Sequence, residues 1–245
     1  MGGRGEQEAC RAWGSNQEES RHGWYDGPHQ AAGGTMARRG KGPGDSIDGR
    51  RAGQSAREKQ QQLADESPFT TLVARVLGIP TAEQAWGRGA DGEEHVGALL
   101  AKLVPHGWAV EHDVKIGRRG ANVDHLVIGP PGVYLIETKL VSADVWVDGD
   151  VIKVGGFSKD YVDKLEADVL HVREKLLAVT KRRRLWVQGL LVFVRPTLKV
   201  VQQPQNVHVL ADHELVPGLL DQEVRLEDAE VKQLVRAARQ ASTWK

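Results

Sequence analysis

Hydrophobic and polar positions divide the chain into a polar beginning and a patterned remainder. Residues 1 to about 52 are rich in Gly, Arg, Gln, Glu and Ser and contain almost no Leu, Ile or Val. Such a segment buries too little apolar surface to offset the entropy lost on ordering, so residues 1–54 are expected to form a disordered tail. Helix-forming but polar residues follow at 55–63, and a short helix is predicted at 69–77. Residues 55–86 are therefore interpreted as a helical lead-in.

The remainder, residues 87–245, alternates between helical and strand-like spacing. Apolar residues recur at helical intervals from 93 to 103, and the glycines between 87 and 92 are expected to precede the start of that helix. Further helices are predicted at 160–177 and 226–241, and strands at 108–116, 122–128, 133–139, 145–147, 151–154, 185–194 and 207–210. The strongly apolar run at 185–194 predicts the buried centre of the sheet. This order of elements indicates one α/β domain with a mixed sheet flanked by helices.

A predicted hairpin around Gly129-Pro130-Pro131-Gly132 carries the most informative pattern. If these four residues form the turn, Ile128 pairs with Val133, and counting back two residues at a time places Asp124 across from Glu137. Like charges directly opposite on a sheet are destabilising. A divalent cation between the two carboxylates would turn that repulsion into binding. Because side chains alternate along a strand, Lys139 shares the face of Glu137 and lies close enough to act with it.

The apolar neighbours of these charged residues help to decide between an ordinary surface position and a functional site. Alone, Asp124 is an ordinary edge-strand carboxylate, and Glu137 with Lys139 is a surface ion pair that contributes little. However, the same face of the hairpin carries Leu126, Ile128, Val133 and Leu135. Charges on an apolar face are costly unless they are paired or bound to metal. The pattern therefore favours a clustered site, of the kind used in metal-assisted phosphodiester hydrolysis.

The composition restricts the binding partners and the cellular location that can be expected. Lys plus Arg and Asp plus Glu both number 33, so no global positive field attracts nucleic acid, and any such contact must come from a local patch. The single cysteine, Cys10, excludes a disulfide framework and a cysteine-based zinc site within one chain. The chain also shows no signal-peptide pattern and no apolar run of membrane-spanning length. A cytoplasmic protein without membrane insertion is expected.

Three stretches resemble a known family: Gly89-Ala90-Asp91-Gly92-Glu93, Asn122 to Pro130, and Gly132 to Lys139. Taken together and in this order they are similar to the nuclease-related domain (NERD) family, a branch of the PD-(D/E)xK nuclease-like superfamily. The resemblance covers roughly residues 86 to 215. Residues 52–57 and 85–86 are also similar to the N-terminal extension of some bacterial members.

The resemblance implies a restriction-endonuclease-like α/β fold and a metal-dependent nuclease site. By this likeness, Asp124, Glu137 and the backbone carbonyl of Thr138 bind Mg²⁺ or Mn²⁺, hard cations that prefer oxygen ligands. Lys139 orients or activates the attacking water and stabilises the phosphorus centre. Glu93 completes the cluster, holding a metal-bound water or a second ion. The expected catalytic set is thus Glu93, Asp124, Glu137 and Lys139.

Further candidates for substrate contact are Asn122, His125, Lys159, Lys164 and Arg173. Asn122 shares the face of Asp124 and is expected mainly to shape the strand entry. His125 points the other way, and a structural role is favoured over contact with substrate.

One helix departs from the family. Many members carry a Gln and, one turn later, an Asn in the helix at 160–177, whereas this chain has Lys164 and Asp168 there. The polar support of the substrate is therefore expected to differ. Three tryptophans, Trp86, Trp108 and Trp146, are able to stack on bases, but packing roles are favoured for all three.

These features predict a metal-dependent nuclease that hydrolyses phosphodiester bonds in DNA, in DNA processing or repair. DNA is the expected partner, with a DNA-processing protein as a further candidate. One alternative is a non-catalytic module that binds nucleic acid or a partner and retains the nuclease fold. Another is a scaffold or signalling protein whose tail and lead-in recruit a partner.

Overall fold

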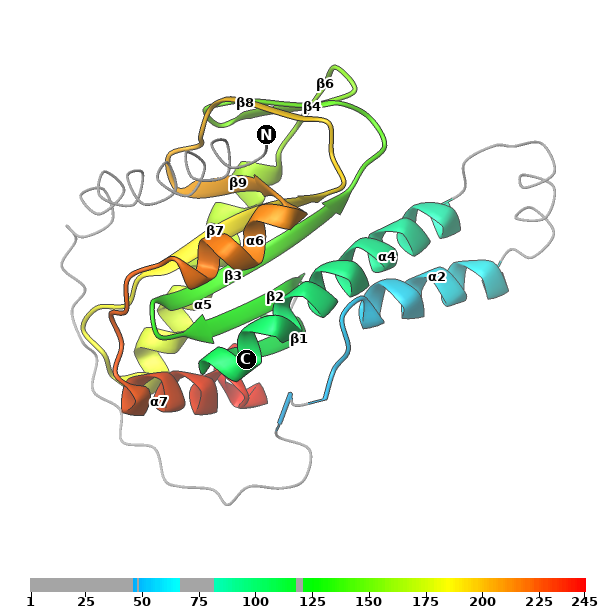
Figure 1. Ribbon diagram of the computed structural model, residues 1–245. Helices are drawn as coiled ribbons and strands as arrows, with labels where there is room; N and C mark the ends of the chain where they lie inside the picture. The colour runs from blue at the N-terminus through cyan, green and yellow to red at the C-terminus, as the bar shows by residue number, and fades with distance from the viewer. Residues whose placement is uncertain (1–45, 48, 67–81, 118–120) are drawn as a thin grey trace.

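The computed structural model describes residues 46–47, 49–66, 82–117 and 121–245, which form a mixed α/β fold (Figure 1). The helices are α2 (Gln54–Glu66), α4 (Ala82–Leu100), α5 (Tyr161–Thr180), α6 (Asp212–Leu220) and α7 (Asp228–Ala238), with short 3-10 helices η1 (Ala101–His106) and η2 (Ala241–Trp244). The strands are β1 (Ala109–Ile116), β2 (Ala121–Gly129), β3 (Gly132–Leu140), β4 (Val145–Asp148), β5 (Val151–Val154), β6 (Phe157–Lys159), β7 (Val187–Val194), β8 (Leu198–Gln202) and β9 (Val207–Ala211).

The main sheet has the strand order β1-β2-β3-β7-β9. Strands β1, β2 and β3 are antiparallel neighbours, whereas β7 runs parallel to both β3 and β9. Every residue of β7 is buried, as predicted for the apolar run at 185–194, and the strand lies inside the sheet between β3, which is the middle strand, and β9. The long crossover from β3 to β7 contains α5, as a parallel connection requires.

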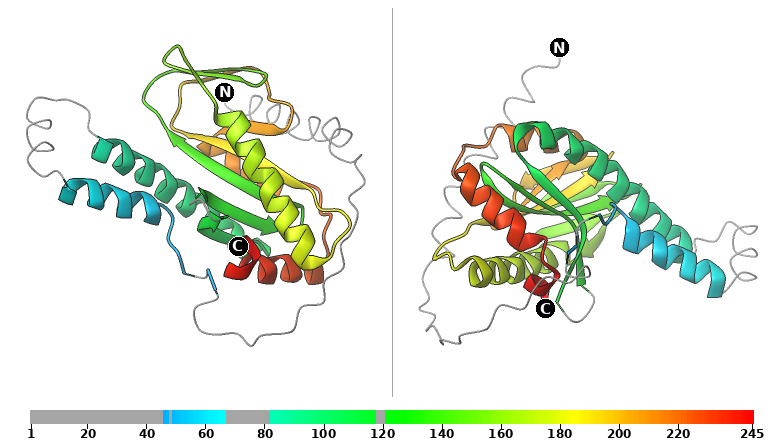
Figure 2. Two further views of the ribbon diagram at one scale, coloured as in Figure 1. Left: turned by 180° about the vertical axis from the view of Figure 1, so that it is seen from behind. Right: turned by 90° about the horizontal axis from the view of Figure 1, so that it is seen from below.

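Helices cover both faces of the main sheet, and the view from below shows the sheet between the two helical layers (Figure 2). Side chains alternate along β3, so Tyr134 and Ile136 pack in one core cluster with α4 and α6, while Val133 and Leu135 pack in the other with α5 and α7. The predicted mixed α/β architecture with flanking helices is confirmed. No helix within the described ranges is both long enough and apolar enough to cross a membrane.

A second sheet, in the order β6-β5-β4-β8, replaces the single sheet that the sequence predicted. It continues beyond the carboxyl ends of two strands of the main sheet, because β4 follows β3 and β8 follows β7 in the chain. Strand β3 is parallel to β7, and β4 is likewise parallel to β8. Strands β6 and β8 and helix α6 were not predicted. All residues of β6 and nearly all of β8 are exposed, so these edge strands lack the alternation of apolar and polar residues that marks a half-buried strand.

Helix α4 begins earlier than predicted. The glycine-rich segment 87–92 was expected to precede the helix, but it lies inside a continuous helix that begins at Ala82. Gly92 has a packing role, since a Cβ there would lie 3.0 Å from the Cβ of Leu140 and 3.3 Å from the Cγ2 of Thr138. The missing side chain lets α4 approach the end of β3 closely, and this contact stabilises a helix that glycines would otherwise weaken.

The lead-in begins earlier than predicted, because residues 46–47 and 49–54, which were assigned to the disordered tail, already pack on the domain. Ser46 forms a β-bridge with Gln240, and the Ile47 N–H donates to the Arg239 carbonyl over 3.0 Å. The boundary placed after residue 54 therefore falls later than the point at which the chain contacts the domain. Helix α2 confirms the predicted helix at 55–63 and lies beside α4 in Figure 1. The predicted disordered tail, up to residue 45, and the predicted helix at 69–77 lie outside the described residues.

Two alanine substitutions in α4 test the packing role of Gly92. We expect Gly92→Ala to lower the free energy of unfolding by about 1–3 kcal/mol, because the new Cβ overpacks the contact with β3. Gly89→Ala is the matched control: no atom lies within 4 Å of its Cβ position, so the higher helix propensity of alanine should stabilise the protein by about 0.5–1 kcal/mol. Denaturant unfolding of the two variants measures both effects. Equal shifts in the same direction would contradict this account.

Candidate active site

The hairpin places the two acids as the sequence predicted. Ile128 pairs with Val133, and the ladder between β2 and β3 continues to the pair His125 and Ile136. Asp124 and Glu137 occupy opposite places at the next position of this register, one residue beyond the pair of His125 and Ile136. There the Thr138 N–H donates to the Asp124 Oδ2 over 2.7 Å, so a side chain takes the place of the backbone partner.

Lys139 and Glu137 share one face and contact each other directly. The Lys139 Nζ donates to the Glu137 Oε1, and it also lies 5.1 Å from the centre of the Tyr161 ring on α5. Burial lowers the pKa of Lys139, but the nearby Glu137 and Asp124 outweigh this effect and hold it above its usual value. The ammonium group is therefore charged at neutral pH, with a quarter of its side chain exposed (25%).

Helix α4 adds a third carboxylate to the cluster. Burial and the neighbouring charges of Asp113 and Glu137 raise the pKa of Glu93 to about 7. A backbone hydrogen bond from Gly53 stabilises the ionised carboxylate and has the opposite, smaller effect on this pKa. Within the described part of the chain its Oε2 is buried and has no hydrogen-bond partner. A carboxylate with this pKa gains and loses a proton near neutral pH, as general acid–base chemistry requires.

Asp124 is the most deeply buried acid of the cluster, with 7% of the residue exposed. Burial, Glu137 and Glu93 raise its pKa well above the usual value, whereas Lys139 and the Thr138 N–H lower it. The structure thus brings Glu93, Asp124, Glu137 and Lys139 into one electrostatic cluster. The charge of Glu137 opposes the ionisation of both Glu93 and Asp124, a pattern typical of functional sites.

The donor set fits Mg²⁺ or Mn²⁺ in kind. Across the described ranges, no group of three or more His, Cys, Asp or Glu side chains is arranged so that it could hold a metal ion. Mg²⁺, however, commonly keeps several waters and binds through one or two carboxylates together with substrate phosphates. The unpartnered Oε2 of Glu93 and the mutual repulsion of the acids provide oxygen atoms and negative charge for such an ion. Asp124 and Glu137 suit direct binding, and Glu93 suits contact through water.

A buried aspartate that the sequence reasoning missed holds the lead-in against this cluster. The Asp113 Oδ2 accepts hydrogen bonds from the Ser55 N–H at 2.9 Å and from Arg50, while its Oδ1 accepts one from the Asn122 Nδ2 at 2.8 Å. Asn122 is therefore bound to protein, consistent with its expected role at the strand entry. No signal in the sequence indicated its burial, because Asp113 shares the polar phase of β1 with Glu111 and Lys115. The partners that bury it come from distant parts of the chain.

The lead-in also touches Glu93. Gly53 adopts φ +71° and lies against α4, where a Cβ would be 2.9 Å from the Ala90 carbonyl oxygen. This close approach, which only glycine permits, puts the Gly53 N–H within reach of the Glu93 carboxylate. The site is thus built from α4, β2, β3 and the lead-in together.

The two polar positions of α5 separate in the structure. Asp168 lies close enough to Glu137 for that charge, together with burial, to raise its pKa. Lys164 instead pairs with Asp160 over 2.8 Å at the surface, with 70% of its side chain exposed. Of these two α5 positions, only Asp168 is therefore placed near the cluster, and no role was predicted for it.

The remaining predicted substrate contacts are His125, Arg173 and Lys159. His125 is fully buried, with its Nδ1 2.9 Å from the Nδ1 of His112, and burial holds its pKa well below the usual value. This position suits the structural role that was favoured. The Arg173 Nε donates to the Leu185 carbonyl over 2.9 Å, while Lys159 is exposed at the end of β6.

The tryptophans differ from one another. Trp108 is buried, with its ring centre 5.7 Å from that of Tyr134, as its expected packing role requires. Trp86 is 44% exposed, and Trp146 is half-buried on the second sheet. Packing was favoured for both, and neither position is that of a core residue.

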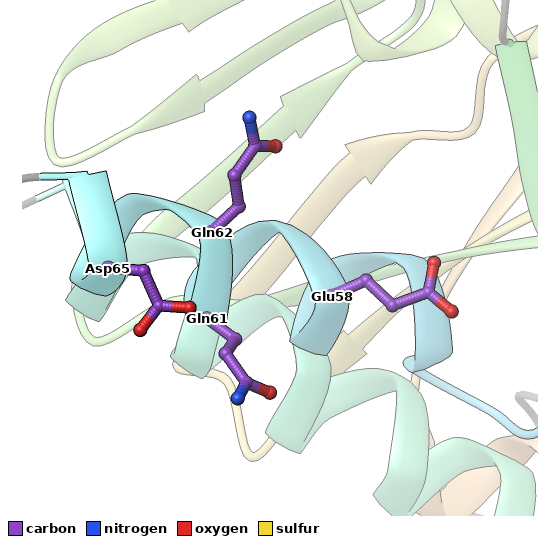
Figure 3. Close-up of a pocket in the computed structure, with 4 residues that line it drawn as sticks. All are labelled: Glu58, Gln61, Gln62 and Asp65. Carbon is purple, nitrogen blue, oxygen red and sulfur yellow. The ribbon is translucent and has the colours of Figure 1, made fainter.

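An open hollow on the surface of α2 lies apart from the acids. It is lined by Glu58, Gln61, Gln62 and Asp65, which Figure 3 shows projecting from the outer side of that helix. None of these polar residues belongs to the cluster.

Removing one acid tests the repulsion within the cluster. Because Glu93 keeps its proton in the folded state up to about pH 7, while an unfolded glutamate loses it near pH 4.5, the folded state loses stability as the pH rises through this window. In metal-free buffer we expect Glu93→Gln to stabilise the protein at pH 8 by on the order of 2–3 kcal/mol and to have little effect at pH 4.5. Asp124→Asn should act in the same direction, because the pKa of Asp124 is also raised.

Denaturant unfolding at both pH values measures this effect. Glu174→Gln, which changes an exposed carboxyl group on α5, is the control and should alter stability by less than about 0.5 kcal/mol at either pH. If both cluster variants instead destabilise the protein at pH 8, the ionised carboxylates of Glu93 and Asp124 stabilise the folded state, which contradicts the predicted repulsion.

A comparison with models of known protein families matches the region of the chain that contains this cluster. Residues 88–194 match the model of a nuclease-related domain, and this range contains Glu93, the hairpin and Lys139. Searches of curated proteins and of solved structures gave no match. The chain therefore carries, over residues 88–194, a domain of the nuclease-related domain (NERD) family, whose general context is the PD-(D/E)xK nuclease-like superfamily.

Proposed function

We propose that this protein is a metal-dependent nuclease that hydrolyses phosphodiester bonds in DNA. One observation carries the proposal: burial and the charge of Glu137 raise the pKa of both Glu93 and Asp124, beside a lysine that stays charged. Such an arrangement costs stability in the metal-free protein, as the raised pKa values indicate. A divalent cation and a phosphate would offset that cost, because the cation neutralises the acids and the phosphate meets the ammonium group.

The metal ion is held by Asp124, Glu137 and the backbone carbonyl of Thr138 in this proposal, as Mg²⁺ or Mn²⁺. When bound, it supplies Lewis-acid stabilisation of phosphate charge and a water of lowered pKa. The contact between Glu137 and Lys139 is compatible with this role, because the second oxygen of the carboxylate is available to the cation.

The side chains of the protein supply the remaining chemistry. The Nζ of Lys139 carries the positive charge that stabilises negative charge on the phosphate oxygens as the transition state forms. Its position beside Tyr161 and Glu137 limits its movement. The Oε2 of Glu93, with a pKa of about 7, accepts a proton from the attacking water.

A non-catalytic nucleic-acid-binding module is the second candidate. It is favoured by the absence, in the part of the chain that the structure describes, of three acids arranged to hold a metal ion together. The balance of 33 basic and 33 acidic residues also gives no overall attraction for DNA. In this case Lys139 would serve mainly as the counter-ion of the buried acids.

A cleavage assay separates the two candidates. Purified protein is incubated with single-stranded, double-stranded and branched DNA in the presence of Mg²⁺, Mn²⁺ or EDTA. We expect metal-dependent cleavage that falls at least about 100-fold in Lys139→Ala, the loss typical of removing one group that stabilises the transition state. Lys102→Ala, which removes an exposed lysine on η1, is the matched control and should keep full activity.

Metal binding is measured separately by thermal unfolding. Mn²⁺ should raise the melting temperature of the wild type and of Lys139→Ala but not that of Asp124→Asn. A shift with metal but no cleavage of any DNA would overturn the nuclease proposal in favour of the binding module. Unchanged cleavage by Asp124→Asn would show that the site has been assigned wrongly.

A further inference from the structure

The second sheet carries a row of side chains that the proposed chemistry does not use. The strand register aligns Ser158 with Lys153, Lys153 with Trp146, and Trp146 with Lys199, across β6, β5, β4 and β8. Residues directly paired on neighbouring strands project from the same face of a sheet. These four residues, the Trp146 row, therefore lie side by side on one face.

This face points away from the core. The adjacent positions Val145, Val147 and Ile152 are almost fully buried in the cluster beneath α5, at 1%, 0% and 0% exposed. Because side chains alternate along each strand, the Trp146 row projects to the opposite, outer side. Ser158 and Lys199 are exposed there, and Lys153 and Trp146 are half-buried against each other.

The row combines an aromatic ring with flanking positive charge. The Lys153 Nζ lies 5.1 Å from the centre of the Trp146 ring, and Lys199 borders the ring from the opposite strand. Asp148 is an acid that shares this face on β4, two residues beyond Trp146, and Val151, its partner on β5, adds apolar surface at 49% exposed. Two lysines on either side of one indole favour a ligand with alternating aromatic and anionic groups.

The second sheet is joined to the candidate active site at two points. Strand β4 follows the end of β3, which carries Glu137 and Lys139, and β6 leads into α5 at Tyr161, whose ring lies under the Lys139 ammonium. Figure 1 shows the small sheet at the end of the molecule where β3 and β7 terminate. A polymer lying on the outer face can therefore extend towards the acids.

We propose that the Trp146 row binds single-stranded DNA, with a base stacked on Trp146 and neighbouring phosphates paired with Lys153 and Lys199. A single strand fits better than a duplex, because its bases are unstacked and free to lie on an aromatic side chain of a sheet. This inference rests on the proposed function, since it names the form of the substrate and the surface that holds it. It concerns residues outside the acidic cluster.

Fluorescence anisotropy of a labelled dT20 oligonucleotide tests the row in EDTA, where no cleavage occurs. We expect Trp146→Ala to weaken binding at least about fivefold, the lower end of the loss on removing one stacked base, and Trp146→Phe to retain most of the affinity. Lys153→Ala with Lys199→Ala should weaken binding and reduce the magnitude of the slope of log K against log salt by about 1.4. A labelled 20-base-pair duplex should show no comparable loss in Trp146→Ala.

Two exposed residues elsewhere provide matched controls. Trp86→Ala, on α4, and Lys102→Ala, on η1, should leave dT20 binding within about twofold of the wild type. Thermal unfolding of each variant shows that it is folded. Binding of dT20 that is unchanged in Trp146→Ala, or equally weakened in Trp86→Ala, would overturn the inference.

Failure of this inference can be distinguished from failure of the nuclease proposal. Tight dT20 binding that depends on Trp146, in a protein that cleaves no DNA, would support this surface and refute the catalytic role. Cleavage that requires Lys139, with dT20 affinity unaffected by the Trp146 row, would do the reverse. Failure of the wild type to bind dT20 at all would also overturn the inference.

Discussion

Electrostatic repulsion among buried acids is the constraint on which this structure depends. Asp124 lies almost wholly inside the protein, close enough to Glu137 and Glu93 that their charges and burial raise its pKa well above the usual value. An isolated buried carboxylate is costly, and two more beside it increase that cost. The Lys139 ammonium and the Thr138 N–H offset part of it. The geometry therefore favours the binding of further positive charge.

The rest of the fold holds these acids in place against their repulsion. Strands β2 and β3 are fixed by the turn at Pro130 and Pro131 and by packing on both faces of the sheet. Helix α4 approaches β3 closely at Gly92, which sets the depth of Glu93. The lead-in closes the far side, because Asp113 binds Arg50 and Ser55, and Gly53 donates to Glu93. Residues 50–55 lie outside the matched range 88–194, yet they contribute to the same site.

The division into two sheets gives the domain two chemically different surfaces. The main sheet is covered by helices on both sides, so its strands supply the core and the acids. Among the residues that the structure describes, the second sheet is packed against the core on one side, which leaves Trp146 and its flanking lysines on the other. A chain with no net charge can still concentrate positive charge on a local surface of this kind. The overall composition therefore says little about whether the protein binds nucleic acid.

The sequence by itself determined the hairpin register, the buried strand at 187–194 and the juxtaposition of Asp124, Glu137 and Lys139, whereas Glu93 was assigned from the family resemblance. These features depend on local signals: the alternation of apolar residues, a proline-rich turn and a run of β-formers. Only the tertiary structure decided that α4 continues through its glycines, that β4 and β5 leave the main sheet, and that Asp113 ties the lead-in to the site. Each of these depends on contacts between residues distant in the chain, such as Gly92 with Leu140 and Asp113 with Arg50. Local propensity carries no information about such contacts, because the partner that stabilises each arrangement is supplied by another part of the fold.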